Sequence, residues 1–418
     1  MKIEIKQRIK QIRQGNVPEE YQKTKDGIFP ADWHAQKMKQ WVALAERPVT
    51  LEDDKRYRLV TVRRGFGGVD LRGEYLGKGI LVKNYFRVRQ GDFLISKRQI
   101  AHGACGVVPE SLDGAVVSNE YNVFVPNQGT NIEMFNLMMQ LPHYTRLFYL
   151  MSDGVHIEKL LFKTQDWMRR QLAMPPIEEQ RKIATILTTQ NKAIELKEKR
   201  LAEKQRQKKY LMQQLLSGKK RLPGFSGEWE KAKLKSILHE RKTYSPKGLD
   251  YPHVTLSTEG IFPKSERYDR DHLVRDEDKE YKITHKGDIC YNPANLKFGV
   301  ICENTFGDAI FSPIYVTFEV RKNVCREYLA NYLMRWDFIN AVRKYEEGTV
   351  YERMAVKPED FLKFEISLPQ IEEQTAIAEV LSTADREIDL LRQDIEQEKQ
   401  KKKALMQLLL TGIVRVKT

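Results

Sequence analysis

Three short motifs carry residue types that could do chemistry, and each lacks a part that its reaction needs. Asn292-Pro293 begins like the base-holding motif of adenine methyltransferases, but Ala294-Asn295 breaks it. Glu280-Tyr-Lys282 has the acid–lysine spacing of metal-dependent nucleases without the upstream Pro-Asp. The glycines around Gly67 lack the spacing of a dinucleotide-binding loop, and the chain has no P-loop. We therefore expect no catalytic centre on this chain.

The cysteines are the next candidates for chemistry. They are Cys105, Cys290, Cys302 and Cys325. No two of them form a C-x-x-C pair, and no histidine cluster lies near them at the spacing of metal ligands. We expect isolated thiols in a reducing compartment, with no metal and no cofactor on this chain.

Charge narrows the class of partner. The 418 residues hold 71 Lys and Arg against 57 Asp and Glu, a net charge of +14. This surplus favours a polyanion, nucleic acid above all, although solvated lysine faces would give the same count. No apolar run reaches the length of a membrane span, and the charged residues 1–6 argue against a secretion signal and for the cytoplasm.

The chain repeats itself, and the repeat organises everything else. Residues 177–218 align without a gap to residues 371–412 at an offset of 194, with about 18 of 42 positions identical. Chance would give about two or three. The repeat extends weakly through the preceding segments, where Gly91-Asp92 matches Gly287-Asp288 at an offset of 196. We infer a duplication in which a variable globular part alternates with a near-constant helical part.

The constant segments are predicted to be helical. Each opens after prolines with Ile-Glu-Glu-Gln and ends at Gly218 or Gly412. Ser382-x-x-Asp385 resembles a capping box and predicts that a second, longer helix starts there, as does the weaker Thr188-x-x-Asn191. A helix from Asp385 to Thr411 would be about 40 Å long.

A seven-residue apolar seam in these helices predicts helix pairing. The seam residues are Ile194, Leu201, Leu215, Ile388, Ile395 and Leu409, with lysines 208 and 402 at the matching middle position. The simplest arrangement is an antiparallel coiled coil that spaces the globular parts; the alternative is that each helix covers only its own domain. Residues 5–15 resemble the end of each long helix, so the duplication looks circular.

The globular parts show strand-like alternation with a few helical stretches, which predicts an α+β class. Strands are expected at 57–62, 93–96, 116–125, 253–256 and 309–320, and helices at 132–141 and 327–345. The expected divisions are an N-terminal helical arm 1–32 packing with the C-terminal helical region, globular domains 33–174 and 223–368, and helical regions 175–222 and 369–418.

Two P-x-I-E-E-Q-x-x-I-A helices, each followed by a helix ending in L-M-Q-x-L-L, resemble the repeated conserved regions of type I restriction–modification specificity subunits. The segment from Leu211 to Trp229 is similar to that family's join between the first helix and the second recognition domain. The resemblance covers essentially the whole chain.

The resemblance implies two target recognition domains, each reading one half of a bipartite DNA site, with a pseudo-twofold circular repeat. It also implies that the helices hold the domains apart and bind two methyltransferase subunits, which restriction (motor-nuclease) subunits join. S-adenosylmethionine, ATP and magnesium would belong to those partners. Because the two halves differ in sequence, the expected site is asymmetric.

Loops that differ on a shared frame are the candidate DNA-binding elements. In the first domain they hold Arg63, Arg64, Lys97, Arg98, Gln99 and His102. In the second they hold Ser257, Thr258, Tyr291, Asn292, Asn295 and Lys297. Arginine and lysine suit guanine edges and phosphates, and carboxamides suit adenine. The alternative for the loop at Arg63 is a solvated turn.

The repeated helix starts hold the candidate subunit-interface residues. They are Ile177, Glu178, Glu179, Gln180, Ile371, Glu372, Glu373 and Gln374. Helix capping and packing between the helical units explain them equally well.

Two other functional classes are weighed beside the specificity subunit. One is a methyltransferase or nuclease with two readers, which needs a cofactor or metal site. The other is a repeat scaffold or RNA-binding protein, which the basic charge permits.

Overall fold

The computed structural model describes residues 3–24, 27–154, 160–246, 250–264, 280–346 and 355–416. The chain forms two compact units: Met1–Lys197 with Asp394–Thr418, and Glu198–Gln393. Each unit therefore combines the start of one long helix with the end of the other. In the described ranges, no helix is long and apolar enough to cross a membrane.

The long helices are α6 (Ile177–Leu215) and α11 (Ile371–Leu409), each 39 residues without a break. The expected second helix start at Thr188 and Ser382 is therefore wrong. Inside the helix, Thr188 donates its hydroxyl to the Ala184 carbonyl and Ser382 donates to the Glu379 carbonyl. A hydroxyl that bonds the preceding turn does not cap a new helix. At 1.5 Å per residue each helix is about 58 Å long, not about 40 Å.

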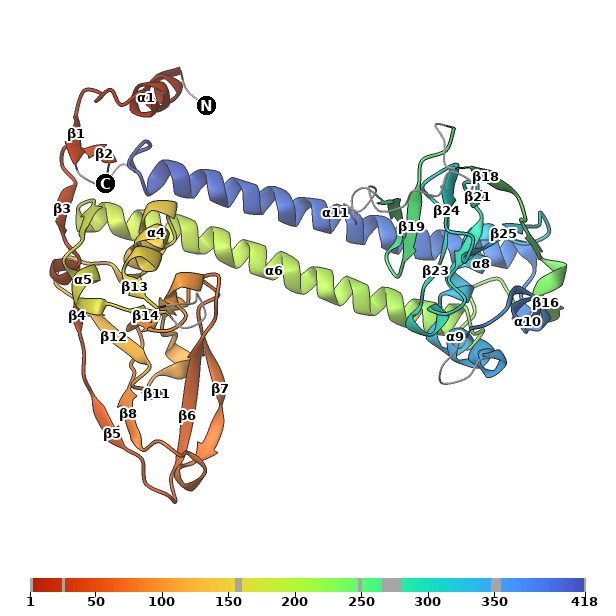
Figure 1. Ribbon diagram of the computed structural model, residues 1–418, viewed down its shortest axis with the longest axis horizontal. Coiled ribbons are helices and arrows are strands. Elements are labelled where there is room, and N and C mark those ends of the chain that lie inside the picture. The colour runs from red at the N-terminus through yellow and green to blue at the C-terminus, as the bar shows by residue number, and fades with distance from the viewer. Residues whose placement is uncertain are drawn as a thin grey trace. The chain divides into compact units, whose positions relative to one another are not determined.

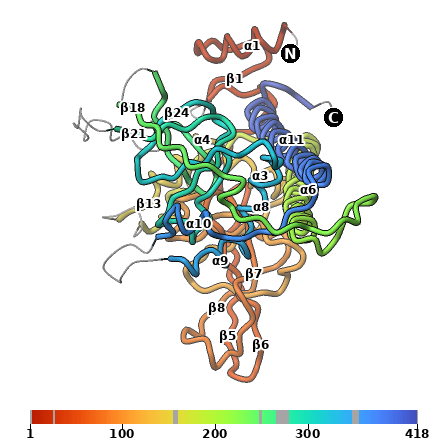
Figure 2. The backbone as a smooth tube through the Cα atoms, turned by 90° about the vertical axis from the view of Figure 1, so that its right-hand side faces the viewer, coloured from red at the N-terminus to blue at the C-terminus, as the bar shows by residue number. Residues whose placement is uncertain are grey.

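The two helices pack antiparallel within each unit, as the sequence predicted (Figures 1 and 2). In the first unit, Lys197 pairs with Asp394 at 2.8 Å and with Glu398 at 3.0 Å. Hydrogen bonds from Gln190 and Lys197 lower the pKa of the Glu398 carboxyl to about 2. In the second unit, Lys208 pairs with Asp385 at 2.5 Å.

The predicted seam residues are mostly covered from solvent. Ile194, Leu215, Ile388, Ile395 and Leu409 are buried, and Leu201 is half-buried. Leu409 and Leu215 belong to the two domain cores, so a continuous apolar seam between α6 and α11 stays a prediction beside the interhelical ion pairs.

The first domain is built from two sheets, ordered β10-β9-β12-β4 and β5-β8-β11-β6-β7. Their strands are β4 (Val42–Leu44), β5 (Pro48–Thr50), β6 (Arg56–Val62), β7 (Val69–Leu76), β8 (Asn84–Arg87), β9 (Phe93–Ser96), β10 (Cys105–Val107), β11 (Val116–Ser118) and β12 (Tyr121–Pro126). The hairpin β6–β7 forms the longest ladder in this domain (Figure 1).

The second domain repeats this plan, with sheets ordered β17-β25-β22-β23 and β18-β21-β24 and the hairpin β19-β20. Its strands are β17 (Leu238–Glu240), β18 (Tyr244–Pro246), β19 (Val254–Ser257), β20 (Gly260–Pro263), β21 (Glu280–Thr284), β22 (Ile289–Tyr291), β23 (Ile301–Glu303), β24 (Ala309–Phe311) and β25 (Val316–Val320). The four-stranded sheets match strand for strand, so the α+β prediction and the duplication are confirmed.

Short elements join the sheets to the long helices. In the first unit these are α1 (Ile3–Arg13), β1 (Tyr21–Thr24), β2 (Gly27–Pro30), β3 (His34–Lys37), α2 (Met38–Trp41), α3 (Ile132–Met139), α4 (Pro142–Leu150), β13 (Ser152–Asp153), β14 (Leu161–Phe162), α5 (Thr164–Met168) and β15 (Gln171–Met174). In the second they are β16 (Glu230–Lys233), α8 (Arg326–Leu333), α9 (Trp336–Val342), α10 (Pro358–Lys363) and β26 (Glu365–Leu368). The ribbons β3-β15 and β16-β26 close the two domains in the same way.

Three predicted elements are interrupted. The segment 116–125 forms β11 and β12 around a turn, and 309–320 forms β24 and β25 around another. The predicted helix 327–345 divides into α8 and α9 at Met334, because Arg335 takes an extended conformation there. An apolar periodicity that continues across a sharp turn hides the turn from a sequence pattern.

Each domain core is aromatic and continuous with the start of its long helix. In the first unit, Trp167 packs against Phe124 and Phe148 at centroid distances of 5.4 and 6.1 Å. In the second, Phe361 replaces Trp167 and stacks on Tyr291 at 4.8 Å. The same clusters include Ile183 on α6 and Ile377 on α11, so each helix start is part of a domain core.

Two buried glutamates fasten the end of one sequence copy to the start of the other. Glu373 is 2% exposed and accepts two hydrogen bonds from Arg221, at 2.5 and 2.6 Å. Glu179 is 1% exposed and accepts from Arg415, at 2.8 and 2.7 Å. Arg415 also pairs with Asp32 at 2.7 Å. We call these contacts the Arg–Glu clamps. The arginine and the glutamate of one clamp correspond to those of the other at the repeat offset of 194.

The glutamine that follows each clamped glutamate fastens its helix to the domain. Gln180 donates to the Pro175 carbonyl and accepts from the Asn131 backbone, at 2.8 Å each. Gln374 donates to the Pro369 carbonyl at 2.8 Å and accepts from the Cys325 backbone at 2.9 Å. Capping and packing therefore account for Glu179, Gln180, Glu373 and Gln374.

The N-terminal segment lies against the end of α11. Arg8 donates to the Ile413 carbonyl at 2.6 Å, and the Tyr21 hydroxyl donates to the Gly412 carbonyl at 2.6 Å. Gly412 takes a positive φ of 69°, and a Cβ there would come within 2.5 Å of Pro30. Glycine is required at this position because the backbone turns left-handed against a packed neighbour.

The helix pair offers an internal test of its electrostatics. Lys402 is the counterpart of Lys208, and burial lowers the pKa of Lys402. The position equivalent to Asp385 holds Asn191, which cannot supply a charge. We predict that Asn191→Asp stabilises the first unit by about 0.3–1 kcal/mol at pH 7, as a partly exposed ion pair does.

Because the added carboxylate favours protonated Lys402, the gain should be complete at neutral pH and should fade as pH rises through the lysine pKa. Urea unfolding at pH 7 and pH 11 measures this. The mirror change Asp385→Asn is the control and should cost a similar amount in the second unit. A variant Asn191→Asp that is no more stable than the parent at pH 7 contradicts the pairing.

The clamps predict a larger effect. Arg221→Ala leaves a buried carboxylate without its partner, and such a loss costs about 3–5 kcal/mol. Adding Glu373→Gln to Arg221→Ala should recover part of the loss, since the amide carries no charge to desolvate. Urea unfolding of both variants measures the difference; equal stability of the single variant and the parent would show that the clamp does not hold the fold.

Candidate nucleic-acid interface

The two predicted DNA-binding loops of the first domain form one surface. The loop after β6 donates from the Gly65 backbone to the His102 carbonyl at 2.7 Å. It also donates from the Phe66 backbone to the Gly103 carbonyl at 2.8 Å. Phe66 takes a positive φ of 59°, and a Cβ on Gly103 would come within 3.0 Å of its ring. The close approach of these backbones fixes the two loops together.

The cations of this surface are exposed and loosely held. Arg63 forms an ion pair with Asp70, and Arg98 forms one with Glu120 at 2.6 Å. The hydrogen bond to Glu120 raises the pKa of Arg98. Arg64 is exposed and Lys97 is half-buried. Exposed ion pairs contribute little stability, so these side chains can exchange a carboxylate for a phosphate at low cost.

A strand and a 3₁₀ turn position the remaining candidates of the first domain. Lys97 and Arg98 follow the last residue of β9, and Gln99 begins the 3₁₀ turn Ile100–His102. Ile100 is 1% exposed and anchors the turn in the core. His102 and Gln99 are half-buried beside the Phe66 loop.

In the second domain, three of the six candidates are structural. Tyr291 is fully buried, and its hydroxyl donates to the Val356 carbonyl at 3.0 Å. Asn292 is 7% exposed and accepts from the backbones of Ala294 and Asn295. Ser257 is 7% exposed and closes the β19–β20 turn through Gly260. A direct DNA contact for these three is corrected to a packing or turn-forming role.

The other three candidate residues of the second domain remain accessible to a ligand. Thr258 and Asn295 are exposed, and Lys297 lies over the ring of Phe298 with its ammonium 5.3 Å from the centroid. Phe298 is 60% exposed, and the sequence analysis did not single it out. Aligning the two domains at the offset of 196 places Phe298 opposite His102, which would have identified it.

In each domain, a buried aspartate paired with an arginine lies just before the strand that leads into the candidate loop, at the end opposite that loop. Arg47 donates two hydrogen bonds to Asp92, at 2.6 and 3.0 Å, just before β9. Arg241 donates two to Asp288, at 3.0 and 3.1 Å, just before β22. The repeated Gly-Asp pairs of the sequence are therefore part of the frame.

On the helices, the candidates for a subunit interface separate by exposure. Glu178, Ile371 and Glu372 are exposed and Ile177 is half-buried, unlike the four clamp and glutamine residues. Two further residues stand out: Leu196 is 56% exposed and Leu390 is 65% exposed. These leucines are counterparts at the offset of 194, so the duplication has kept an exposed apolar side chain on both helices.

The described groups that the sequence singled out as candidates for chemistry are paired or buried. Lys282 of the acid–lysine triplet is 3% exposed and pairs with Glu240 at 3.4 Å. Burial raises the pKa of the Cys302 thiol to about 12, and it also raises the pKa values of Cys105 and Cys290. Thiols protonated at neutral pH are poor nucleophiles. Among the described residues, no group of His, Cys, Asp or Glu is placed to hold a metal ion.

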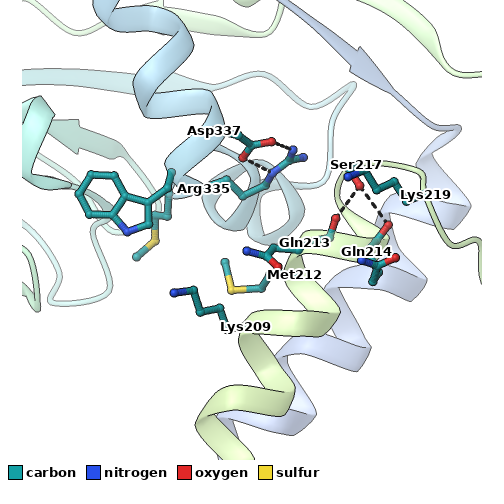
Figure 3. Close-up of a pocket in the computed structure, with 10 residues that line it drawn as sticks. Lys209, Met212, Gln213, Gln214, Ser217, Lys219, Arg335 and Asp337 are labelled. Carbon is teal, nitrogen blue, oxygen red and sulfur yellow. Dashed lines mark hydrogen bonds and ion pairs between the residues drawn. The ribbon is translucent and has the colours of Figure 1, made fainter.

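One sizeable groove lies where α6 ends in the second unit (Figure 3). Asp337 in its wall is paired with Arg335, which also donates to the Leu216 carbonyl at the helix end. Ser217 donates its hydroxyl back to the Gln213 carbonyl. Arg335, Asp337 and Ser217 are therefore engaged in contacts at the end of the helix.

Comparison with known proteins agrees with this architecture. Residues 226–400 match the family described as type I restriction modification DNA specificity domain. The chain is 24% identical to the proposed specificity subunit of the type I restriction enzyme MjaX of Methanocaldococcus jannaschii, over 96% of this chain and 98% of the relative. A second relative, the specificity subunit of MjaVIII from the same organism, is 25% identical over 63% of this chain and 65% of its own length.

Two solved structures share the fold. One is the S subunit of the type I restriction–modification system from M. genitalium, with a TM-score of 0.56, 10% identity, and coverage of 92% of this chain and 97% of that one. The other comes from a study of assembly and conformational transition in the type I system, with a TM-score of 0.56, 17% identity, and coverage of 92% and 99%.

The duplicated domains and the antiparallel helices run through the chain, and the family match covers residues 226–400. Residues 226–400 therefore carry the type I restriction modification DNA specificity domain, and the chain as a whole is similar to type I specificity subunits.

Proposed function

We propose that each β-rich domain reads one half of an asymmetric, bipartite site in duplex DNA. The observation that carries this proposal is one backbone frame used twice with different side chains. Similar frames would hold the two reading loops alike, and the different side chains would make the halves of the site differ. Arg64, Lys97 and Arg98 in the first domain and Lys297 in the second supply cations for phosphates or guanine edges.

We further propose that the helices fix the spacing of the two half-sites. An unbroken helix of 39 residues is stiff, and α6 and α11 are cross-linked by ion pairs. Changing the number of residues in both helices would then change the nonspecific gap.

The exposed helix residues support a docking role for two methyltransferase subunits. The counterparts Leu196 and Leu390 offer one apolar contact on each unit, and Glu178 and Glu372 repeat in the same way. A duplicated surface suits two copies of one partner. In this proposal the methyltransferases carry S-adenosylmethionine, and the restriction (motor-nuclease) subunits that join them carry ATP and magnesium.

The test of the two-reader proposal is the methylation pattern of cells that carry this chain with its methyltransferase. We expect a split motif, two short specific parts around a fixed gap. Exchanging residues 229–367 for the corresponding domain of another specificity subunit should change one part and leave the other. A continuous motif that ignores the exchange would overturn the proposal.

The docking proposal predicts a separate defect. Leu196→Asp and Leu390→Asp should each weaken binding of the methyltransferase at least tenfold at one of its two positions, because a charge replaces an apolar contact. Leu81→Asp is the control, since Leu81 is 98% exposed on the first domain and has no leucine counterpart. Mass measurement of the assembled complex counts the bound subunits. Full occupancy in both helix variants would place the docking surface elsewhere.

A further inference from the structure

The turn after β9 and the turn after β22 each form the same set of backbone hydrogen bonds, between corresponding residues. In the first domain these bonds are Gln99→Ser96, His102→Gln99, Gly103→Ile100, Ala104→Gln99 and Ser96→Ala104, each from N–H to carbonyl. In the second they are Asn295→Asn292, Phe298→Asn295, Gly299→Leu296, Val300→Asn295 and Asn292→Val300. Every residue differs from its counterpart by 196, so the domains hold one turn in two versions.

The anchors of the turn are kept in both versions. Ile100 is 1% exposed and Leu296 is fully buried, and both fill the core under the turn. Gly103 and Gly299 end it with φ values of 73° and 80°. A left-handed residue there favours glycine, so the path of the turn is fixed whatever its other side chains are.

At one position, half-buried in the first domain and exposed in the second, the side-chain chemistry is also kept. Gln99 and Asn295 both start the 3₁₀ turn, with φ and ψ of −118° and 3°, and −110° and 8°. Neither carboxamide caps the turn, although Asn292 does so at a neighbouring position. Among the described residues, the Gln99 Oε1 has no hydrogen-bond partner and is covered from solvent. A buried acceptor without a partner is unfavourable, so the carboxamide gains by rotating to meet a donor on a bound ligand.

The accessible positions around this carboxamide have changed. Ala101 and His102 in the first turn correspond to Lys297 and Phe298 in the second. Arg98 corresponds to Ala294, and Lys97 to Pro293. The turn therefore combines one repeated polar group with several variable ones.

We propose that Gln99 and Asn295 read the same kind of base, an adenine, at the same place in the two half-sites. A carboxamide accepts from the adenine N6 amino group and donates to N7, a pairing that no other base offers in the major groove. The variable neighbours, His102 in one turn and Phe298 with Lys297 in the other, set the bases beside that adenine. This inference rests on the proposed function, since it assigns residues within the two-reader interface.

The experiment reads the methylated motif from genomic DNA of cells carrying the full chain and its methyltransferase. Gln99→Ala should relax one adenine position in one half of the motif by at least tenfold in preference and leave the other half unchanged. Asn295→Ala should do the same in the other half. Gln90→Ala is the control, because this exposed carboxamide precedes the frame at the opposite end of β9, and it should leave the motif unchanged.

The conservative variants Gln99→Asn and Asn295→Gln keep the carboxamide. They should therefore keep the adenine preference, with a reduced rate of methylation. If an alanine variant loses all methylation, the conservative variant at the same position decides. A methylated motif that again contains the adenine supports the inference. A complex that assembles but does not methylate a motif with that adenine overturns it. An unchanged split motif in both alanine variants also overturns it and leaves the two-reader function standing. A parent chain without a split motif removes the proposed function itself.

Discussion

The fold depends on two carboxylates that are buried where the copies of the sequence meet. Glu179 and Glu373 open the long helices, and each is neutralised by an arginine that follows the end of the other long helix. A buried charge without a partner is costly, so each helix start can adopt its place only when the other helix end is also in place. The glutamines that follow then fix each helix start to its domain core through backbone groups. The circular arrangement of the two sequence copies therefore follows from the burial of each glutamate together with its arginine.

This constraint separates what must stay constant from what can vary. The constant part comprises the clamps, the Arg–Asp pairs before β9 and β22, and the buried anchors of the turns. The variable part lies on the loops that this frame holds. A recognition protein benefits from the division, because a loop can change its side chains without a change in the backbone that positions it.

Much of the fold follows from the sequence because the duplication is visible in it. The antiparallel helices and the resemblance to type I specificity subunits were predicted from repeated motifs, and the α+β class was predicted from strand-like alternation; all three are confirmed. The helix break at Ser382 was wrong because serine and threonine can bond a carbonyl of the preceding turn within a helix as well as cap a new one. The clamps were missed because Arg221 and Glu373 are 152 residues apart in the chain.

The candidate site was harder to predict, since side-chain direction decides it. Tyr291 and Asn292 lie at the end of a buried strand and point into the core or the turn, whereas Asn295 is only a few residues away and is exposed. Phe298 carries no charge and was overlooked, although its exposure is unusual for an aromatic residue.

The most direct test of the central claim, one frame used as two readers, is hydroxyl-radical footprinting of the assembled complex on DNA that carries its methylation motif. The account predicts two protected blocks that coincide with the two specific parts of the motif and a less protected gap between them. One continuous block of even protection, centred on a single domain's contacts, would contradict it.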